Sequence, residues 1–218
     1  MLSETNTETR TPKQQTGIRN TLIFLFGIIA LMLGLFVSSA LKPRGLSHEE
    51  YYKLGYFGYE PSRVIEEFKL TNHYGEEVGL DDLKGSWSLL FFGFTYCPDI
   101  CPTTMGVLNR AVIKMKKKPQ VIMVSVDSDR DTPELLAQYV PNFNSDFVGY
   151  TGDFDELVSL ATQLNAAFAK VPGKDPGTYT MDHTASIAVI NPNGRFQGFI
   201  KSPPQAVNIT RILDSLMM

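Results

Sequence analysis

The chain opens with a polar segment followed by a long apolar one. Residues 1–20 are rich in Thr and Gln, a composition that predicts a disordered polar tail. Residues 21–41 carry no charged side chain, and a helix of this length, rising ~1.5 Å per residue, spans the roughly 30 Å hydrocarbon layer of a bilayer. Ser38-Ser39-Ala40 resembles the cleavage site of a signal peptide, but the apolar core of such a peptide is usually only about 7–15 residues long. We therefore predict a transmembrane anchor over residues 21–41.

Lysine and arginine residues slightly favour the N-terminal side of this anchor. The basic residues that flank it are Arg10, Lys13 and Arg19 before it, and Lys42 and Arg44 after it. This distribution predicts a cytoplasmic tail and an exported C-terminal domain. Glu4 and Glu8 argue against a mitochondrial transit peptide, which is normally poor in acidic residues. The expected location is a bacterial inner membrane with the domain in the periplasm; the alternative is the mitochondrial inner membrane, facing the intermembrane space.

Beyond the anchor, apolar and β-branched runs predict strands. Residues 42–60 are aromatic and contain glycine, and we interpret them as a stalk that links the anchor to a domain over residues 61–218 and can pack on that domain. Residues 68–78 have the form of a hairpin with Gly75 in its turn. The further predicted strands cover residues 88–95, 120–126, 147–150, 185–190 and 195–200. The last two form a second hairpin, because the Asn-Gly pair between them favours a tight turn.

Helical periodicity alternates with these strands. Apolar residues recur at spacings of three and four in three segments, each predicted to be a helix. They are residues 103–116, 153–165 and 206–216. Another helix begins at Pro133, with Thr132 as its N-cap, whereas residues 171–180 hold two prolines and two glycines and are expected to form a loop. The order β–α–β–α–β–α–β–β–α, with central strands apolar on both faces, predicts an α/β domain in which helices cover a mixed sheet.

Length and charge limit the function classes. The ~175 residues beyond the anchor fit one domain with a sizeable core. The chain has 20 basic and 23 acidic residues, a formal net charge of −3. Binding to nucleic acid usually needs a strongly basic face, so this balance gives no electrostatic case for a nucleic-acid partner.

The only two cysteines of the chain stand where a buried strand passes into a helix. Cys97 and Cys101 lie in the sequence Cys-Pro-Asp-Ile-Cys-Pro, shortly after the apolar run at residues 88–95. Pro102 fits the first position of a helix, so the helix is expected to start there with Cys101 at its cap. The free N–H groups and the positive dipole at that end favour thiolate and predict lowered thiol pKa values.

Four interpretations of this cysteine pair compete. A structural disulfide would close only a tiny loop and would stabilise the fold little through chain entropy. A dithiol that exchanges electrons or disulfides fits the position, although three residues rather than two separate the cysteines. An inert buried pair is the third interpretation, and the polar, proline-rich loop argues against it. A metal site is the fourth and needs a further ligand.

Histidines are the candidates for that ligand. His48 falls in the predicted stalk and His73 in the first hairpin, where an exposed or packed histidine is the ordinary outcome. His183 stands at the mouth of the strand at residues 185–190, beside the strand–helix turn where open sheets bind ligands. The sequence leaves open whether His183 is a ligand or a plain strand-end histidine. Two thiolates and one imidazole would suit Cu(I), because structural zinc usually takes four ligands.

Three separated motifs carry a resemblance to a known family. They are Gly93-Phe-Thr-Tyr-Cys-Pro-Asp-Ile-Cys-Pro-Thr-Thr-Met105, Val124-Ser-Val-Asp127 with Arg130-Asp-Thr-Pro133, and Asp182-His-Thr-Ala-Ser186. In this order, over about residues 60–216, they resemble the Sco/SenC family of membrane-anchored copper proteins for cytochrome c oxidase assembly. Tyr96 stands where many relatives have histidine, which removes a possible auxiliary ligand and leaves the three principal ones intact.

The resemblance implies a thioredoxin-like fold and a single copper ion, as Cu(I) or Cu(II), held by Cys97, Cys101 and His183. It also implies delivery of copper to, or reduction of cysteines at, the dinuclear copper site of cytochrome c oxidase subunit II. A copper donor protein and a thiol reductant are the further partners expected. Asp182 and Asp127 are candidate hydrogen-bond acceptors for the imidazole or the loop, although the acidic run that Asp127 begins is more often a solvated turn.

Two other function classes remain beside this metallochaperone. A thiol–disulfide oxidoreductase would use Cys97 and Cys101 as a redox pair acting on partner cysteines. A peroxidase of the thioredoxin superfamily lacks support, because the chain has no separate resolving cysteine and the loop lacks the expected Thr-x-x-Cys pattern.

Overall fold

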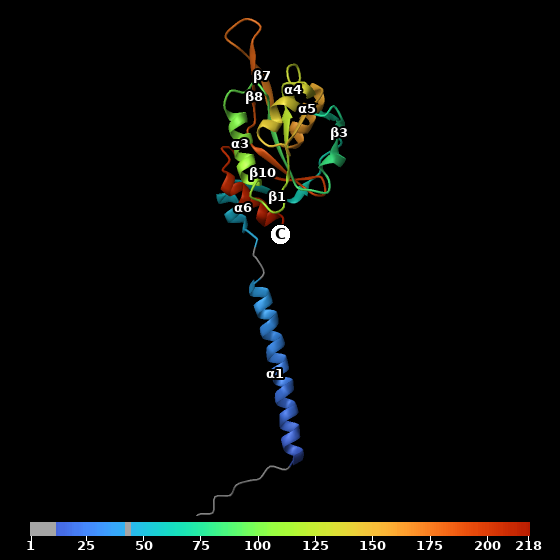
Figure 1. Ribbon diagram of the computed structural model, residues 1–218, viewed down its shortest axis with the longest axis vertical. Coiled ribbons are helices and arrows are strands. Elements are labelled where there is room, and N and C mark those ends of the chain that lie inside the picture. Colours follow the sequence, from blue (N-terminus) through green and yellow to red (C-terminus); the bar gives the residue numbers. More distant parts are fainter. Residues whose placement is uncertain (1–11, 42–44) are drawn as a thin grey trace, which may run out of the picture. The chain divides into compact units, whose positions relative to one another are not determined.

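The computed structural model describes residues 12–41 and 45–218. The chain divides into two compact units, Met1–Arg44 and Gly45–Met218. Every strand of the described chain belongs to the second unit, as does every described helix except the first (Figure 1). The sheet and the candidate metal ligands therefore all lie in the second unit.

The described part of the first unit is a single helix, α1 (Pro12–Leu41). Its segment Thr21–Ser38 is long and apolar enough to cross a membrane, a property that an anchor shares with a signal sequence. The helix includes residues 12–20, which the sequence predicted to be disordered. Residues 1–11 of the predicted polar tail lie outside the described residues.

Ten strands are present in the described part of the chain. They are β1 (Tyr56–Arg63), β2 (Leu70–Asn72), β3 (Glu77–Val78), β4 (Ser88–Gly93), β5 (Gln120–Ser125), β6 (Val148–Thr151), β7 (Phe168–Pro172), β8 (Tyr179–His183), β9 (Ile187–Asn191) and β10 (Arg195–Ile200). Eight of them form one sheet in the order β1-β10-β9-β4-β5-β6-β2-β3, while β7 and β8 pair only with each other. β4, β5 and β6 run parallel and the remaining pairs are antiparallel. This is the mixed sheet that the sequence predicts.

The core lies around the central strands β4, β5 and β9. Every residue of β4 and β9 is buried. Because successive side chains of a strand point to opposite faces, complete burial means that both faces of the sheet are covered. Phe91 of β4 stands opposite Met123 and Ile187 on the two neighbouring strands, and burying a side chain of this kind stabilises the fold by about 1.5–3 kcal/mol. The loop that follows β4 therefore starts from a rigid base.

Helices complete the second unit. They are α2 (His48–Lys53), α3 (Ile100–Val112), α4 (Pro133–Tyr139), α5 (Phe154–Gln163) and α6 (Ala206–Leu216), with the 3₁₀ helices η1 (Leu80–Leu83) and η2 (Val140–Asn142). α3 and α6 pack against each other (Figure 1), and the Thr210 hydroxyl donates to the Ala111 carbonyl at 3.0 Å. α4 begins as predicted, because the Thr132 hydroxyl oxygen accepts from the Leu135 N–H and Pro133 stands in the first turn.

The described part of the predicted stalk, residues 45–60, is folded. It contains α2 and most of β1, and β1 is the edge strand of the sheet, with Tyr56 opposite Ile200 of β10. Tyr56 is buried, and its ring centroid lies 5.1 Å from that of Tyr51. Tyr51, Tyr56 and Tyr59 of this segment pack on the domain, as the stalk interpretation allowed, whereas Tyr52 is exposed. The compact unit consequently begins at Gly45, earlier than the sequence places the domain.

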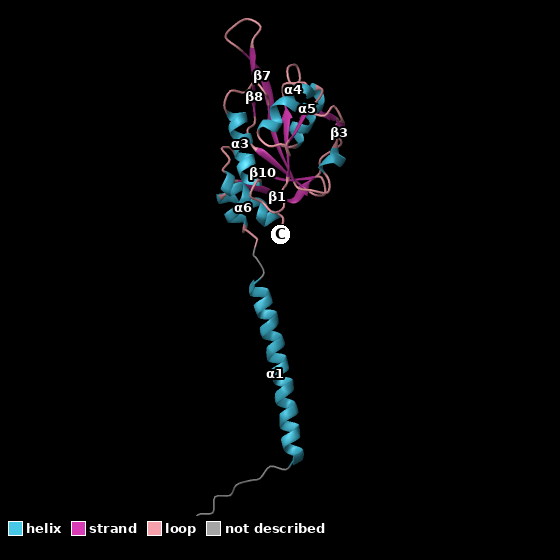
Figure 2. Ribbon diagram, in the orientation of Figure 1, coloured by secondary structure: helices cyan, strands magenta, loops and turns pink. Residues whose placement is uncertain are grey.

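The segment 171–180, which was expected to be a loop, is the turn end of a hairpin, so the expectation holds for residues 173–178 and is wrong for residues 171–172 and 179–180. β7 and β8 pair along their length, with Phe168 opposite His183 at the open end, and only residues 173–178 form the connecting loop. Figure 2 shows this hairpin projecting from the main sheet. Among its ten strand residues only Met181 is buried. The strands therefore lack an alternating apolar pattern, and the prolines and glycines near the turn dominate the sequence signal.

Candidate metal centre

The two cysteines lie in the loop after β4 and in the first turn of α3. The helix begins at Ile100 with Asp99 as its N-cap, so Cys101 is already helical. The predicted start at Pro102 is wrong, because proline is tolerated within the first turn, where its missing N–H needs no intrahelical partner. The Cys101 N–H donates to Cys97 Sγ at 3.4 Å, which folds the loop back over the start of the helix. Both cysteines are free and buried.

The third candidate ligand, His183, is the last residue of β8. Its Nε2 lies 3.5 Å from Cys101 Sγ, and its Nδ1 lies 3.2 Å from the Thr184 carbonyl oxygen. A carbonyl can only accept, so a neutral ring here carries its proton on Nδ1 and directs the Nε2 lone pair toward the sulfur. The rings of Phe91 and Phe94 stand edge-on to the imidazole, each with its centroid 5.9 Å away. These contacts fix the orientation of the ring.

The ligand atoms of Cys97, Cys101 and His183 all lie within 4.8 Å of one another. The sequence left His183 open between a ligand and a strand-end histidine, and the structure brings it to the cysteine pair. No other group of three or more His, Cys, Asp or Glu side chains with this geometry occurs among the described residues.

Burial sets the protonation of this site. It raises the pKa of the Cys101 thiol well above its usual value, and the hydrogen bond with Cys97 adds to the rise. The sequence predicted a lowered value from the helix dipole, but the loss of hydration is the larger effect for Cys101. Burial also lowers the pKa of His183, against smaller opposing contributions from the Thr184 carbonyl and the Asp182 charge. The imidazole is therefore ready to coordinate, whereas Cys101 must first release a proton.

The surroundings fit a soft ion with few ligands. Two sulfurs and one imidazole nitrogen form the donor set that suits Cu(I), and the neighbouring side chains are apolar. Gly93 makes room for this arrangement: a Cβ there would lie 3.1 Å from Cys101 Sγ and 2.9 Å from Phe91 Cε1. A larger residue at this position would therefore displace the sulfur.

The other two histidines take no part in the site. His73 is buried, and its Nδ1 accepts from the Gly149 N–H at 2.8 Å, so it holds the loop after β2 against β6. His48 is exposed at the start of α2. Both are the packed or exposed histidines that the sequence predicts.

Neither candidate carboxylate accepts a hydrogen bond from the imidazole, which faces the Thr184 carbonyl instead. Asp182 is exposed. Asp127 is fully buried, and its two oxygens accept from the Arg130 guanidinium at 2.5 Å and from the Tyr179 hydroxyl at 2.7 Å. Asp182 and Asp127, predicted as acceptors for the imidazole or the loop, do not accept from the imidazole, and the partners of Asp127 are Arg130 and Tyr179, which lie outside the cysteine loop.

A further buried carboxylate was missed. Asp131 is fully buried and accepts from the N–H and the hydroxyl of Thr95 and from the Ser125 hydroxyl. It thereby ties the base of the cysteine loop to the end of β5. The expectation of a solvated acidic turn is wrong for both Asp127 and Asp131, and the available signal was their position directly after a buried strand.

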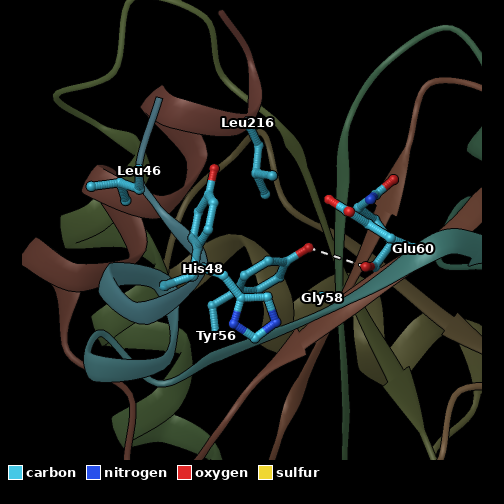
Figure 3. A pocket seen from close by; sticks show the side chains of 8 residues that line it. Leu46, His48, Tyr56, Gly58, Glu60 and Leu216 are labelled. Atoms are coloured by element: carbon cyan, nitrogen blue, oxygen red, sulfur yellow. Dashed lines mark hydrogen bonds between the residues drawn. The ribbon is translucent and has the colours of Figure 1, made fainter. Parts of the chain in front are cut away.

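A cavity of about 410 Å³ lies elsewhere in the second unit, between α2, β1 and α6 (Figure 3). Its lining residues are Leu46, His48, Tyr51, Tyr56, Gly58, Glu60, Gln197 and Leu216. The two tyrosine hydroxyls are engaged, since Tyr56 donates to the Gln197 carbonyl (dashed in Figure 3) and Tyr51 donates to Ser215. This cavity contains none of the three candidate ligands.

A mixed sheet with a cysteine pair at a strand–helix junction, and an imidazole beside it, defines a thioredoxin-like protein with a soft-ligand site. The family profile described as SCO1/SenC matches residues 58–218. The chain therefore belongs to the SCO1/SenC family, as the sequence motifs indicated.

Several known proteins are similar to this chain in sequence or fold. A SCO2-like protein of Rickettsia felis is 30% identical over 207 residues, which cover 89% of this chain and 96% of the relative. The structure of Bradyrhizobium japonicum ScoI with copper bound is 35% identical, has a TM-score of 0.63, and matches 71% of this chain and 98% of that one. A structure of BsSco, described as a member of the Sco family of cytochrome c oxidase assembly proteins with a disulfide switch, is 25% identical, with a TM-score of 0.54 and coverage of 71% and 94%. These matches confirm the predicted fold class.

Proposed function

We propose that this chain binds one copper ion through Cys97, Cys101 and His183. The observation that carries the proposal is the convergence of their ligand atoms within 4.8 Å. The solved ScoI of Bradyrhizobium japonicum contains copper, which supports copper as the ion. Cu(I) is stable with few soft ligands, so two thiolates and an imidazole are enough to hold it. Because so few bonds hold the ion, we treat it as cargo that is loaded and released.

The proposed recipient is the dinuclear copper site of cytochrome c oxidase subunit II. Family membership supports this role, together with the description of BsSco as a cytochrome c oxidase assembly protein. A hollow of about 300 Å³ beside His183, lined in part by Phe168 and Asp182, leaves one side of the site open to a partner. A copper donor protein loads the site, and a thiol reductant keeps both cysteines reduced, because a disulfide has no thiolate to offer.

The proposed location is the bacterial inner membrane, with the second unit in the periplasm. The apolar segment Thr21–Ser38 supports a membrane anchor, and the excess of basic residues before it supports a cytoplasmic N-terminus. The alternative is the mitochondrial inner membrane, with the domain facing the intermembrane space.

Copper titration of the full chain in detergent, against a chromogenic Cu(I) chelator, tests the proposal. The variants are Cys97→Ser, Cys101→Ser and His183→Ala, with His48→Ala as the matched control, since His48 is exposed and outside the site. We expect one equivalent of copper and a loss of more than about 100-fold in affinity for each site variant, because losing a ligand exceeds the 10–100-fold cost of losing an outer partner. Full affinity in His183→Ala would overturn the ligand assignment.

A second candidate function is that of a thiol–disulfide oxidoreductase. The proximity of the two free cysteines supports it, because their sulfurs lie within 4.8 Å of each other and need to approach to about 2.05 Å to form a disulfide. In this reaction the dithiol gives two electrons and two protons to a partner disulfide and becomes a disulfide itself. His183→Ala separates the functions, since dithiol exchange survives this change and copper retention does not.

A further inference from the structure

The hairpin that carries His183 is not part of the main sheet. β7 and β8 pair only with each other, so no backbone ladder fixes their distance from the cysteine loop. Three residues join His183 to Ile187 of β9, opposite Phe91, so the chain keeps it near the sulfurs, and side-chain contacts must fix the remaining distance. A side chain that contacts both segments bearing candidate ligands would set the distance between them.

Arg130 is such a group. Its guanidinium carbon lies 3.9 Å from the centroid of the Tyr179 ring in β8 and 4.8 Å from that of the Tyr96 ring. Its Nη1 donates to the Tyr179 carbonyl oxygen at 3.3 Å. Tyr96 directly precedes Cys97, and Tyr179 stands four residues before His183. One side chain thus touches both the cysteine loop and the histidine hairpin.

Asp127 anchors this arginine to the core. The carboxylate is fully buried at the end of β5, and its Oδ2 lies 2.5 Å from both Nε and Nη2 of Arg130. Its Oδ1 accepts from the Tyr179 hydroxyl at 2.7 Å. A buried carboxylate without partners costs several kcal/mol, so Asp127 strongly favours the arrangement in which both partners are present. The hairpin is thereby fastened to the same strand end that supports the cysteine loop.

The geometry requires arginine. A planar guanidinium can stack on two aromatic rings while its N–H groups bind a carboxylate and a carbonyl. A lysine ammonium is a single hydrated point charge and cannot make these contacts together. An ion pair between Lys170 and Asp129 also joins the hairpin to this loop, but both side chains are largely exposed, so it contributes little.

We propose that Arg130 is a positioning residue that sets the distance between the cysteine pair and the His183 imidazole. The proposal deepens the proposed copper function and rests on it. Arg130 touches no ligand atom; it acts through Tyr96 and Tyr179. Losing it frees the hairpin and lowers copper affinity while leaving all three ligands in the chain.

The test compares Arg130→Lys with Arg63→Lys in the full chain. Arg63 is a matched control because its guanidinium carbon also lies over a tyrosine ring, 5.3 Å from the centroid of Tyr59. Arg63 is exposed and is far from the cysteines in the sequence. Backbone hydrogen exchange of the metal-free protein is the first measurement. In Arg130→Lys we expect the hairpin amides to exchange about tenfold faster, the order of a lost pair of cation–π contacts, with β4 and β5 amides unchanged. If the hairpin amides of Arg130→Lys exchange at the same rate as those of the wild type, the proposal is overturned.

Copper affinity and the electron paramagnetic resonance spectrum of the Cu(II) form are the second measurement. Arg130→Lys should bind copper about tenfold more weakly, with altered copper hyperfine splitting, whereas Arg63→Lys matches the wild type. If His183→Ala loses copper while Arg130→Lys keeps wild-type affinity and spectrum, the proposal fails and the copper site stands. If wild type and His183→Ala bind alike, the copper proposal fails instead.

A milder variant covers the case in which Arg130→Lys does not fold. Tyr179→Phe keeps the ring beneath the guanidinium and removes only the hydroxyl bound to Asp127. It should shift hairpin exchange and the Cu(II) spectrum in the same direction by a smaller amount. Exchange and spectrum identical to the wild type in Tyr179→Phe would count against the proposal.

Discussion

Cys101 Sγ lies 3.5 Å from His183 Nε2, although 82 positions separate the two residues in the chain. The cysteine stands in the first turn of α3, on the main sheet, and the histidine on a separate hairpin. The contact therefore depends on two segments that share no backbone pairing. The contact should respond differently to three kinds of change: protonation of the ligands, packing beside the sulfur, and the position of the domain boundary. The effect of each change can be measured.

Copper affinity should fall as the pH is lowered from 7.5 to 5. Burial raises the pKa of the Cys101 thiol, so the metal-free protein holds this proton throughout the range and copper must displace it. Affinity then changes by about tenfold per pH unit for each thiol proton released. Chelator competition at fixed pH steps measures the slope. An affinity that does not change between pH 7.5 and 5 would contradict the ligand set.

The metal-free protein should lose stability as the pH falls below 6.5. Burial lowers the pKa of His183 and of His73 from the usual 6.5, so below this pH the unfolded state binds more protons than the folded state and the free energy of unfolding decreases. The loss of stability develops between pH 6.5 and the lower pKa values of these two histidines in the folded state. Above pH 6.5 they cause no loss of stability. Urea unfolding of wild type and His183→Ala at pH 7.5 and 5 measures it. The variant should lose less stability than the wild type; an equal loss would show that His183 is not buried in solution.

Gly93→Ala should reduce both stability and copper affinity. The added methyl group would stand 3.1 Å from Cys101 Sγ and 2.9 Å from Phe91 Cε1, and overpacking of this kind costs about 1–3 kcal/mol. Gly106→Ala in α3 is the matched control, because its methyl group would meet only Arg110 Nη1 at 3.5 Å and alanine is favoured over glycine in a helix by about 0.5–1 kcal/mol. Thermal unfolding of both variants checks the stability changes, which should be a loss in Gly93→Ala and a gain in Gly106→Ala. Copper titration of both variants checks the affinity. Wild-type affinity in Gly93→Ala would show that the sulfur has room to move.

Deleting residues 1–44 should leave a soluble folded domain, whereas deleting residues 1–60 should not. The second deletion removes α2 and most of β1, so the edge of β10 is uncovered and the buried Tyr56 is lost. Gel filtration and thermal unfolding compare the two proteins. A cooperative transition is expected only for the first. Aggregation of the first protein, or cooperative unfolding of the second, would place the domain boundary elsewhere.

The central strands and the cysteine loop were predictable because local pattern determines them. The runs that became β4 and β5 are short and apolar at almost every position, as expected of strands covered on both faces. The cap at Thr132 likewise follows from local chemistry. The order of these elements was therefore correct, and the family motifs placed the cysteines at their junction.

The elements that were missed depend on contacts distant in sequence. β8 buries only Met181, so no alternation marks it as a strand, and its pairing with β7 exists only in three dimensions. Tyr56 and its neighbours resembled a linker because the strand they cover, β10, comes some 140 residues later. Asp127 seemed solvated because its partner Tyr179 lies 52 residues away. Tertiary partners, which no window of sequence contains, decided each of these cases.

The separateness of the β7–β8 hairpin bears on how an ion leaves the site. The sulfurs are held by the body of the domain, and the imidazole is held by an appendage that shares no backbone hydrogen-bond ladder with the main sheet. Withdrawing the imidazole therefore requires breaking a handful of side-chain contacts, among them those with Phe91 and Phe94, and leaves the pairing of the main sheet intact. The energetic threshold for handing over cargo is thus set by a local opening, which costs less free energy than unfolding the whole domain.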